Sequence, residues 1–212
     1  MEDVLAVYEQ PYNSAEPVVC LDEKSVSLHA DLHPPIPAEP GKPAKRDNEY
    51  KRHGTANVFA AVEPKAGRHF TTATPDRSGA ELARIVDHIA GQYPSADTIH
   101  LVMDNLNTHN RKTLVKHRGQ EKGAALWNRF TVHYTPKHGS WLNQAEIELS
   151  MFSRQCLGTR RIPAFKTLRK ETAAWNREAN RTRKTINWGF TRRQARKKFG
   201  YRKPRLRLRA SQ

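Results

Sequence analysis

The hydrophobic pattern of the chain predicts the strands of one sheet. Short β-branched runs at residues 17–21 and 98–105 predict buried strands, and the alternating pattern of residues 130–136 predicts another. Residues 25–30 either continue the first strand or pair with it. Two further runs, residues 56–64 and 68–75, flank the turn sequence "KAG" and predict a β-hairpin.

Helices are predicted where apolar residues recur every three or four positions. Residues 80–93 carry such a stripe, and residues 107–128 are typical of one or two short helices. A further helix is expected from Ser140, as its N-cap, and the last over residues 164–180. Residues 1–16 are polar without a strong period, so no element is predicted there.

The order of these elements predicts an α/β fold. Three strands come first and strands then alternate with helices, which implies a mixed sheet flanked by helices. The proline-rich sequence of residues 33–45 predicts a long surface loop between the first strand and the hairpin.

Charge adds a prediction about partners. The chain has 37 Lys and Arg against 21 Asp and Glu, a formal charge of +16. Such a charge favours a polyphosphate partner, and nucleic acid is the usual one; a ribosome-associated protein is the alternative. Residues 181–212 contain thirteen basic and no acidic residues. We therefore expect one domain over residues 1–180 and a basic tail over 181–212, either solvated or in contact with nucleic acid.

Other features restrict the class of protein. The two cysteines, Cys20 and Cys156, lie in apolar runs and are expected to be buried thiols. No apolar stretch approaches the roughly 18 residues of a membrane span. The acidic start, "MEDVLAVYEQ", is unlike a signal peptide, so a cytoplasmic protein with no membrane partner is expected.

Two aspartates follow apolar strands. Asp22 ends the run "VVCLD", and Asp104 ends "IHLVMD". Ligands of α/β sheets gather at the carboxyl ends of strands, and Mg²⁺ is commonly held there by one or two carboxylates. The sequence therefore predicts a divalent metal at these aspartates; the alternative is that both merely begin turns.

A pair of glutamates follows on the helix expected after Ser140. Glu146 and Glu148 are two residues apart, so they point in directions about 200° apart. Both flank the apolar stripe of that helix, on opposite sides. The helical period therefore predicts that one of them reaches the strand ends and leaves open which.

The histidines give a weaker indication. His100, His109, His133 and His138 lack the spacing of metal ligands. We expect His109 and His138 to be surface-loop histidines; the alternative is that they contact a substrate phosphate.

Three segments together carry a resemblance to a known family. The segments "CLDEKS", "LVMDNLNTH" and "SWLNQAEIELS" resemble the catalytic segments of bacterial insertion-sequence transposases of the mariner superfamily. The segment "NEYKRHGTANVFAAVEPKAG" is similar as well, and the resemblance runs from about residue 17 to about residue 201. It implies a ribonuclease H-like fold and an Asp-Asp-Glu triad.

The resemblance also implies residue roles and chemistry. The triad is Asp22, Asp104 and Glu146, the last because it completes an "LNxxE" pattern, with Glu148 as a control residue. Two Mg²⁺ ions are implied, with Mn²⁺ as a substitute. The implied function is metal-dependent cleavage and strand transfer of double-stranded DNA at transposon ends, in a homodimer at the bacterial nucleoid. The alternatives are an inactive DNA-binding remnant and another ribonuclease H-like nuclease.

Two departures from that family are expected to matter. Family members usually carry a helix-turn-helix region before the catalytic domain, and here the first strand is expected by about residue 17. We therefore expect a truncated copy, half of a split frame or a separated catalytic domain. Glu148 stands where relatives usually have a large apolar residue, which predicts a more polar helix edge or weaker packing.

Overall fold

The computed structural model describes residues 1–201. Its elements, in chain order, are α1 (Glu2–Glu9), β1 (Val18–Asp31), β2 (Tyr50–Glu63), β3 (Arg68–Thr74), α2 (Gly79–Gly91), β4 (Ile99–Met103), α3 (Arg111–Arg118), α4 (Gln120–Asn128), β5 (Phe130–Tyr134), the 3₁₀-helix η1 (Ser140–Leu142), α5 (Ala145–Phe152), the π-helical turn η2 (Ser153–Leu157), α6 (Phe165–Thr182) and α7 (Arg192–Phe199).

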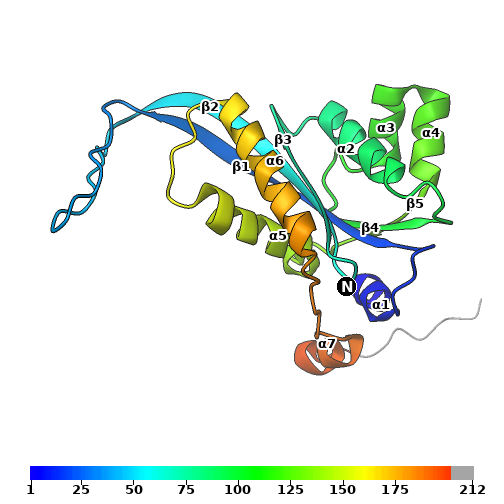
Figure 1. Cartoon of the computed structure of the whole chain (residues 1–212). Coiled ribbons are helices and arrows are strands. Elements are labelled where there is room, and N and C mark those ends of the chain that lie inside the picture. The colour runs from blue at the N-terminus through cyan, green and yellow to red at the C-terminus, as the bar shows by residue number, and fades with distance from the viewer. Residues whose placement is uncertain (202–212) are drawn as a thin grey trace, which may run out of the picture.

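The five strands form one mixed sheet in the order β3-β2-β1-β4-β5 (Figure 1). β1, β2 and β3 pair antiparallel, whereas β4 pairs parallel with β1 and β5 parallel with β4. This confirms the predicted mixed sheet and the hairpin. The β1–β2 ribbon extends far from the body and ends in the proline-rich segment, where only isolated bridges such as Ile36 with Lys45 form.

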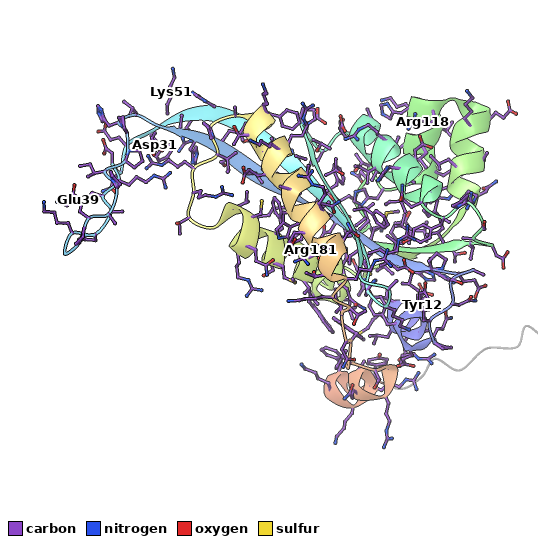
Figure 2. The ribbon with its side chains drawn as sticks, viewed as in Figure 1. Tyr12, Asp31, Glu39, Lys51, Arg118 and Arg181 are labelled. Carbon is purple, nitrogen blue, oxygen red and sulfur yellow. The ribbon has the colours of Figure 1, made fainter. Side chains whose placement is uncertain are left out.

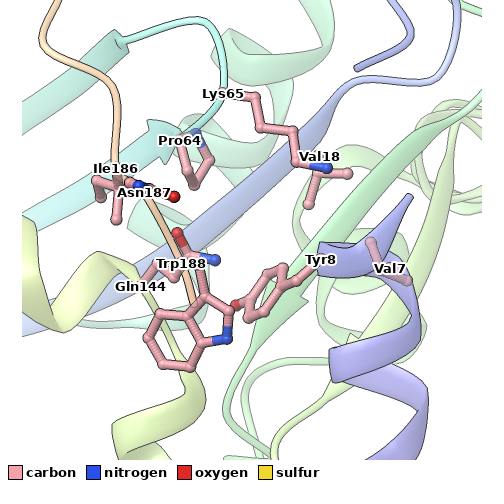
Figure 3. Close-up of a pocket in the computed structure, with 9 residues that line it drawn as sticks. All are labelled: Val7, Tyr8, Val18, Pro64, Lys65, Gln144, Ile186, Asn187 and Trp188. Atoms are coloured by element: carbon pink, nitrogen blue, oxygen red, sulfur yellow. The ribbon is translucent and has the colours of Figure 1, made fainter. Parts of the chain in front are cut away.

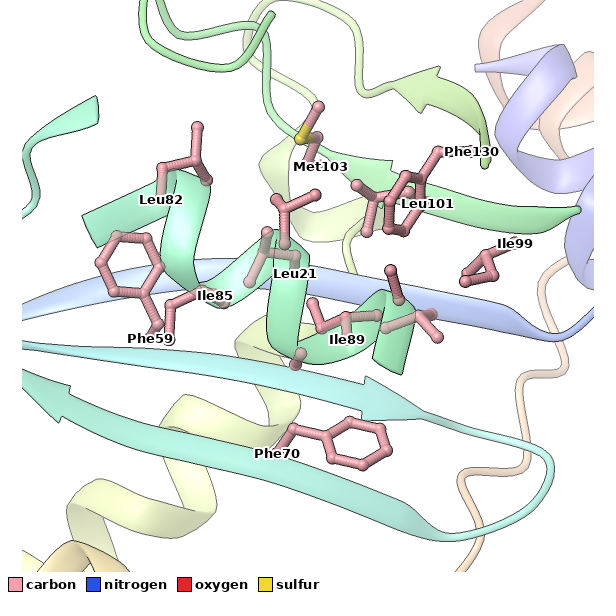
Figure 4. Close-up of a cluster of buried hydrophobic side chains, with 14 of the residues drawn as sticks. Leu21, Phe59, Phe70, Leu82, Ile85, Ile89, Ile99, Leu101, Met103 and Phe130 are labelled. Carbon is pink, nitrogen blue, oxygen red and sulfur yellow. The ribbon is translucent and has the colours of Figure 1, made fainter. Parts of the chain in front are cut away.

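Alternate residues along the strands point to opposite faces of the sheet, and a separate hydrophobic core packs on each face. On β2, Phe59 and Ala61 pack toward α2, in a cluster with Ile85 and Leu101 (Figure 4). Their neighbours Val58 and Ala60 belong to the opposite cluster, with residues of α5 and α6 such as Phe152 and Leu168. The period of two therefore explains why this strand is apolar at consecutive positions: both its faces are covered.

The N-terminal helix α1 was not predicted. Val4, Leu5, Val7 and Tyr8 are buried, at spacings that a helix places along one side. The element has only eight residues, three of them acidic, and a segment this short shows no clear helical period. Its burial against the sheet, together with Cys20 and Val102, supplies the stability that the isolated segment lacks.

The first strand is longer than predicted, which changes the place of Asp22. β1 pairs with β4 only from Val18 to Cys20, but its pairing with β2 continues to Asp31. The antiparallel partner keeps the chain extended after the parallel one has diverged. Asp22 therefore lies within β1, just beyond the β4 pairing; the prediction that it ends the strand is wrong, and the alternative that residues 25–30 continue the strand is confirmed.

The helix expected from Ser140 also begins later. Ser140 opens the short 3₁₀ turn η1 and caps no helix, and α5 starts only at Ala145. The reason is Asn143, whose Nδ2 donates to the carbonyl of Leu21 at 2.8 Å and whose Oδ1 accepts from the N–H of Ala145 at 3.2 Å. This side chain ties the start of the helix to β1.

Part of the basic C-terminal segment packs on the body of the protein. The ring of Trp188 lies 5.5 Å from that of Tyr8, beside a small cavity that Gln144 and Lys65 also line (Figure 3). Ala195 of α7 is fully buried. The division into residues 1–180 and 181–212 remains a prediction, and residues 202–212 of the predicted tail lie outside the described residues.

The remaining basic charge is spread over the surface. Lys51, Arg118 and Arg181 are exposed and project from three separate parts of the fold (Figure 2). Among residues 1–201, no helix is both long and apolar enough to cross a membrane.

Candidate active site

The structure places the three predicted carboxylates close enough for the charges of Asp104 and Glu146 to act on Asp22. Asp22 is half-buried in β1, Asp104 follows the last residue of β4, and Glu146 is exposed in the first turn of α5. Asp22 and Glu146 line the same open cleft. Burial, with smaller contributions from the negative charges of Glu23, Asp104 and Glu146, raises the pKa of Asp22 to about 7.

Strand register explains why the two aspartates meet. Cys20 of β1 stands opposite Val102 of β4 in the parallel pairing. Asp22 and Asp104 each lie two residues further along, at the same edge of the two strands. The parallel arrangement of β1 and β4 thus delivers both carboxylates to the edge where α/β folds bind their ligands.

The third carboxylate is positioned by the "LNxxE" segment. Leu142 and Asn143 are buried, and Asn143 holds the carbonyl of Leu21, the residue before Asp22. The carbonyl of Asn143 accepts the N–H of Glu146 at 3.0 Å. One asparagine therefore fixes the turn that carries Glu146 to the strand that carries Asp22.

Asn143→Ala is expected to weaken both the fold and the site. The substitution leaves a buried carbonyl and a helical N–H without partners, which costs roughly 1–3 kcal/mol of unfolding free energy. Urea denaturation measures that loss. Asn107, exposed in the loop after β4, offers the control Asn107→Ala, which should unfold like the wild type. Equal stability of Asn143→Ala and the wild type would contradict this role.

His109 lies beside Asp104 and is not a surface-loop histidine. It is 2% exposed, with Nδ1 2.6 Å from Asp104 Oδ1 and Nε2 3.6 Å from Glu23 Oε2. The same Nδ1 is 3.2 Å from the carbonyl oxygen of Asp104, the contact with hydrogen-bonding geometry. Burial disfavours the charged imidazole, but the contacts with Asp104 and Glu23 outweigh it and raise the pKa of His109.

The sequence prediction missed Glu23 and misplaced His109. Both lie near the predicted aspartates in the sequence: Glu23 immediately follows Asp22, and His109 comes five residues after Asp104. Desolvation raises the pKa of Glu23, opposed by the nearby charge of His109. This proximity in the sequence was the one signal that could have identified Glu23 and His109 as site residues. The contact between His109 and Glu23 depends on the fold. His138 is exposed, as expected for a loop histidine.

Two further histidines are not loop residues. His100 and His133 lie on the neighbouring strands β4 and β5, with His100 Nδ1 2.9 Å from His133 Nε2. His133 Nδ1 in turn contacts Asp3 Oδ2 of α1 at 2.7 Å. Both histidines therefore lie in the strands predicted over residues 98–105 and 130–136, and through Asp3 the pair connects the sheet to α1.

Glu148 faces away from the cleft and is part of the core. It is 1% exposed, and its Oε1 lies 2.6 Å from His69 Nδ1 and 3.4 Å from the hydroxyl of Thr71, which donates to it. The expectation of a polar helix edge is therefore wrong, because the carboxylate is buried, whereas the role of Glu148 as a control residue for the metal site stays a prediction. His69 and Thr71 on β3 supply the polar partners that a carboxylate needs at this buried position.

The carboxylate oxygens of the site are suitable ligands for a divalent cation that prefers oxygen. Asp104 Oδ1 and Glu23 Oε2 are buried, and within the described part of the chain neither accepts a hydrogen bond of regular geometry, although each lies against a ring nitrogen of His109. Within residues 1–201, no group of three or more His, Cys, Asp or Glu side chains is placed to hold a metal ion, and Asp22, Asp104 and Glu146 form no such group. Mg²⁺ commonly takes only one or two protein carboxylates, with waters and substrate phosphates completing its shell. A cation would also relieve the repulsion that contributes to the raised pKa of Asp22.

Asp22→Asn is expected to stabilise the metal-free protein at alkaline pH. The folded state raises the pKa of Asp22 to about 7, against about 4 when unfolded. The folded chain therefore binds more protons between these values, and its stability falls as pH rises through them. A neutral amide avoids that loss, a gain of about 1–2 kcal/mol after allowance for solvent screening of a half-buried group. Urea unfolding in EDTA should show the advantage at pH 8 and little at pH 4.5; the same difference at both would contradict it.

Comparison with known proteins identifies the family. Residues 17–169 match the family described as "DDE superfamily endonuclease". The chain belongs to this family. The match covers most of the chain and includes β1, β4 and α5, together with the three carboxylates at residues 22, 104 and 146. No curated protein matches this DDE superfamily chain.

Solved structures confirm the ribonuclease H-like fold of this family member. The crystal structure of the Mos1 mariner paired end complex with Mn is 14% identical, with a TM-score of 0.54 over 85% of this chain and 54% of that chain. The Mos1 transposase paired-end complex with left transposon end is 13% identical, with a TM-score of 0.50 over 80% of this chain and 53% of that one. The chain thus spans about half the length of the solved chains.

Proposed function

We propose that the chain is the catalytic domain of a transposase of the bacterial insertion-sequence branch of the mariner superfamily. The observation that carries this proposal is the half-buried carboxylate of Asp22, which shares a cleft with Glu146 and is subject to the negative charges of both Asp104 and Glu146. Carboxylates gathered against their own repulsion are typical of a site that binds a cation. Membership of the endonuclease family makes a phosphodiester the expected substrate.

Asp22, Asp104 and Glu146 would hold the metal, Mg²⁺ or Mn²⁺, and the resemblance to the family implies two ions. When bound, such ions activate the attacking oxygen and stabilise the leaving oxygen of an in-line displacement at phosphorus. The chain's own task is to orient the carboxylates. Asn143 fastens the Glu146 turn to β1, and His109 packs against Asp104.

Double-stranded DNA is the proposed partner. The net charge of +16 favours a polyphosphate, and Lys24 and Arg154 line the same cleft as Asp22 and Glu146. The Mos1 structures are paired-end complexes, one of them with a left transposon end. By analogy we propose transposon ends as the DNA, two copies of this chain in the active complex, and a place in the bacterial cytoplasm at the nucleoid.

A nicking assay with two kinds of duplex tests this proposal. We expect the 212-residue chain to nick double-stranded DNA when Mg²⁺ or Mn²⁺ is present and to be inactive in EDTA. An RNA–DNA hybrid of the same sequence should be a poorer substrate. Cleavage of the hybrid alone would indicate a nuclease that acts on RNA. Binding of DNA without cleavage of either duplex would indicate a DNA-binding remnant, and both results contradict the proposal.

A further inference from the structure

Three aromatic rings from different segments meet on the outside of the fold. Trp141 of η1 lies with its ring 5.5 Å from that of Phe190 and 6.3 Å from that of Phe199, between centroids. Trp141 is 44% exposed and Phe199 is 49% exposed. The ammonium of Lys198 is 5.9 Å from the centroids of both phenylalanine rings. We call these four residues the aromatic patch.

The basic side chains on the inner side of α7, beside the patch, form ion pairs with acidic residues of α1. Ala195 is buried, Arg192 Nε contacts Glu9 Oε2 at 2.7 Å, and Arg196 Nη2 contacts Glu2 Oε2 at 2.6 Å. These contacts dock the helix on α1. Two of its arginines are therefore paired with acidic residues and contribute little charge to the surface.

The outer side of α7 keeps its charge. Arg193, Lys197 and Lys198 are exposed and form no ion pair with any of residues 1–201. Lys198 thus stands beside exposed rings, and Arg193 and Lys197 add two unpaired cations on the same helix. This combination complements a partner that is both anionic and aromatic.

The patch is held in a fixed place relative to the candidate active site. Thr191 and Gln194 form a capping box that fixes the start of α7. The hydroxyl of Tyr8 donates to the carbonyl of Leu142 at 2.8 Å, and Asn143 binds the carbonyl of Leu21. Trp141 therefore belongs to the same anchored segment that leads to Glu146.

We propose that the aromatic patch stacks on unpaired nucleotides of the DNA strand that enters or leaves the candidate active site. Bases stack on exposed aromatic side chains, and nearby cations hold the phosphates. A paired duplex hides the faces of its bases, so only unpaired nucleotides can use the rings. This proposal rests on the proposed function for its substrate, which is DNA.

The test measures binding without catalysis. Fluorescence anisotropy in EDTA compares a blunt DNA duplex, the same duplex with a four-nucleotide single-stranded extension, and the single strand alone. We expect the wild type to bind the extended duplex about tenfold more tightly than the blunt one. Trp141→Ala should abolish that preference, whereas Trp141→Phe should retain most of it. Because the assay contains no metal, the preference can fail while nicking persists, and the reverse.

Two further variants separate stacking from charge. Tyr12→Ala removes a ring that is 55% exposed outside the patch, and it should leave the preference unchanged. Lys197→Ala should weaken binding of both duplexes equally and reduce the salt dependence. Preference for the extension that survives in Trp141→Ala, or is absent in the wild type, overturns the proposal. So does a wild-type dimer that Trp141→Ala converts to a monomer in sedimentation, since the patch would then be a subunit interface.

Discussion

Glu146→Gln is expected to reduce metal-dependent DNA nicking by about 10³-fold while the fold remains intact. The glutamine keeps the size of the side chain but loses the negative charge that would hold a divalent cation. A loss of several kcal/mol in transition-state stabilisation corresponds to a rate decrease of this order. The side chain is exposed, so the free energy of unfolding should change little.

The matched control for this prediction is Glu121→Gln. Glu121 is likewise an exposed glutamate in the first turn of a helix, here α4. Single-turnover nicking rates with Mg²⁺ and with Mn²⁺ measure both variants. The control should react at the wild-type rate; undiminished nicking by Glu146→Gln would remove Glu146 from the site.

For Asp104, the asparagine variant is the better probe. Asp104→Ala would leave buried His109 without the carboxylate against which it packs, so its loss of nicking would mix chemistry with local structure. Asp104→Asn retains the shape of the side chain and removes the charge. We expect it to lose nicking to the same extent as Glu146→Gln.

Glu148→Ala is expected to cause the largest loss of stability, about 3 kcal/mol of unfolding free energy. The change opens a cavity between α5 and β3 and leaves the buried His69 imidazole without its partner. For a chain of this size such a loss lowers the melting temperature by roughly 6–12 °C.

Thermal unfolding tests this prediction directly. Glu148→Gln should lose less, because its amide oxygen can still accept a hydrogen bond from His69. Glu146→Gln, two residues away but exposed, should melt like the wild type and serves as the control. Wild-type melting of Glu148→Ala would show that the buried pair contributes nothing.

The contrast between these two glutamates shows what sequence can predict. The helical period established that they point to opposite sides, and only the family resemblance favoured Glu146. The structure gives a physical reason for the difference: β3 brings His69 and Thr71 against Glu148 from about 80 residues earlier in the chain. No local pattern carries that information, because a buried carboxylate is stabilised by partners that the fold supplies.

The fold itself was largely predictable where a regular spacing of apolar residues extended over a whole element. The hairpin, α2 and the mixed sheet followed from apolar spacing, whereas α1 and the start of α5 did not. The short α1 depends on packing against Cys20 and Val102, and the start of α5 depends on the bond from Asn143 to Leu21. Both are long-range contacts, as is the pairing with β2 that carries β1 past Asp22.

Anomalous scattering from a crystal grown with Mn²⁺ tests most directly whether Asp22, Asp104 and Glu146 form one metal site. The account predicts an anomalous peak in the cleft, coordinated by carboxylate oxygens of these residues, and no peak there in Asp22→Asn. Mn²⁺ bound elsewhere, with the Asp22 carboxylate uncoordinated, would contradict it.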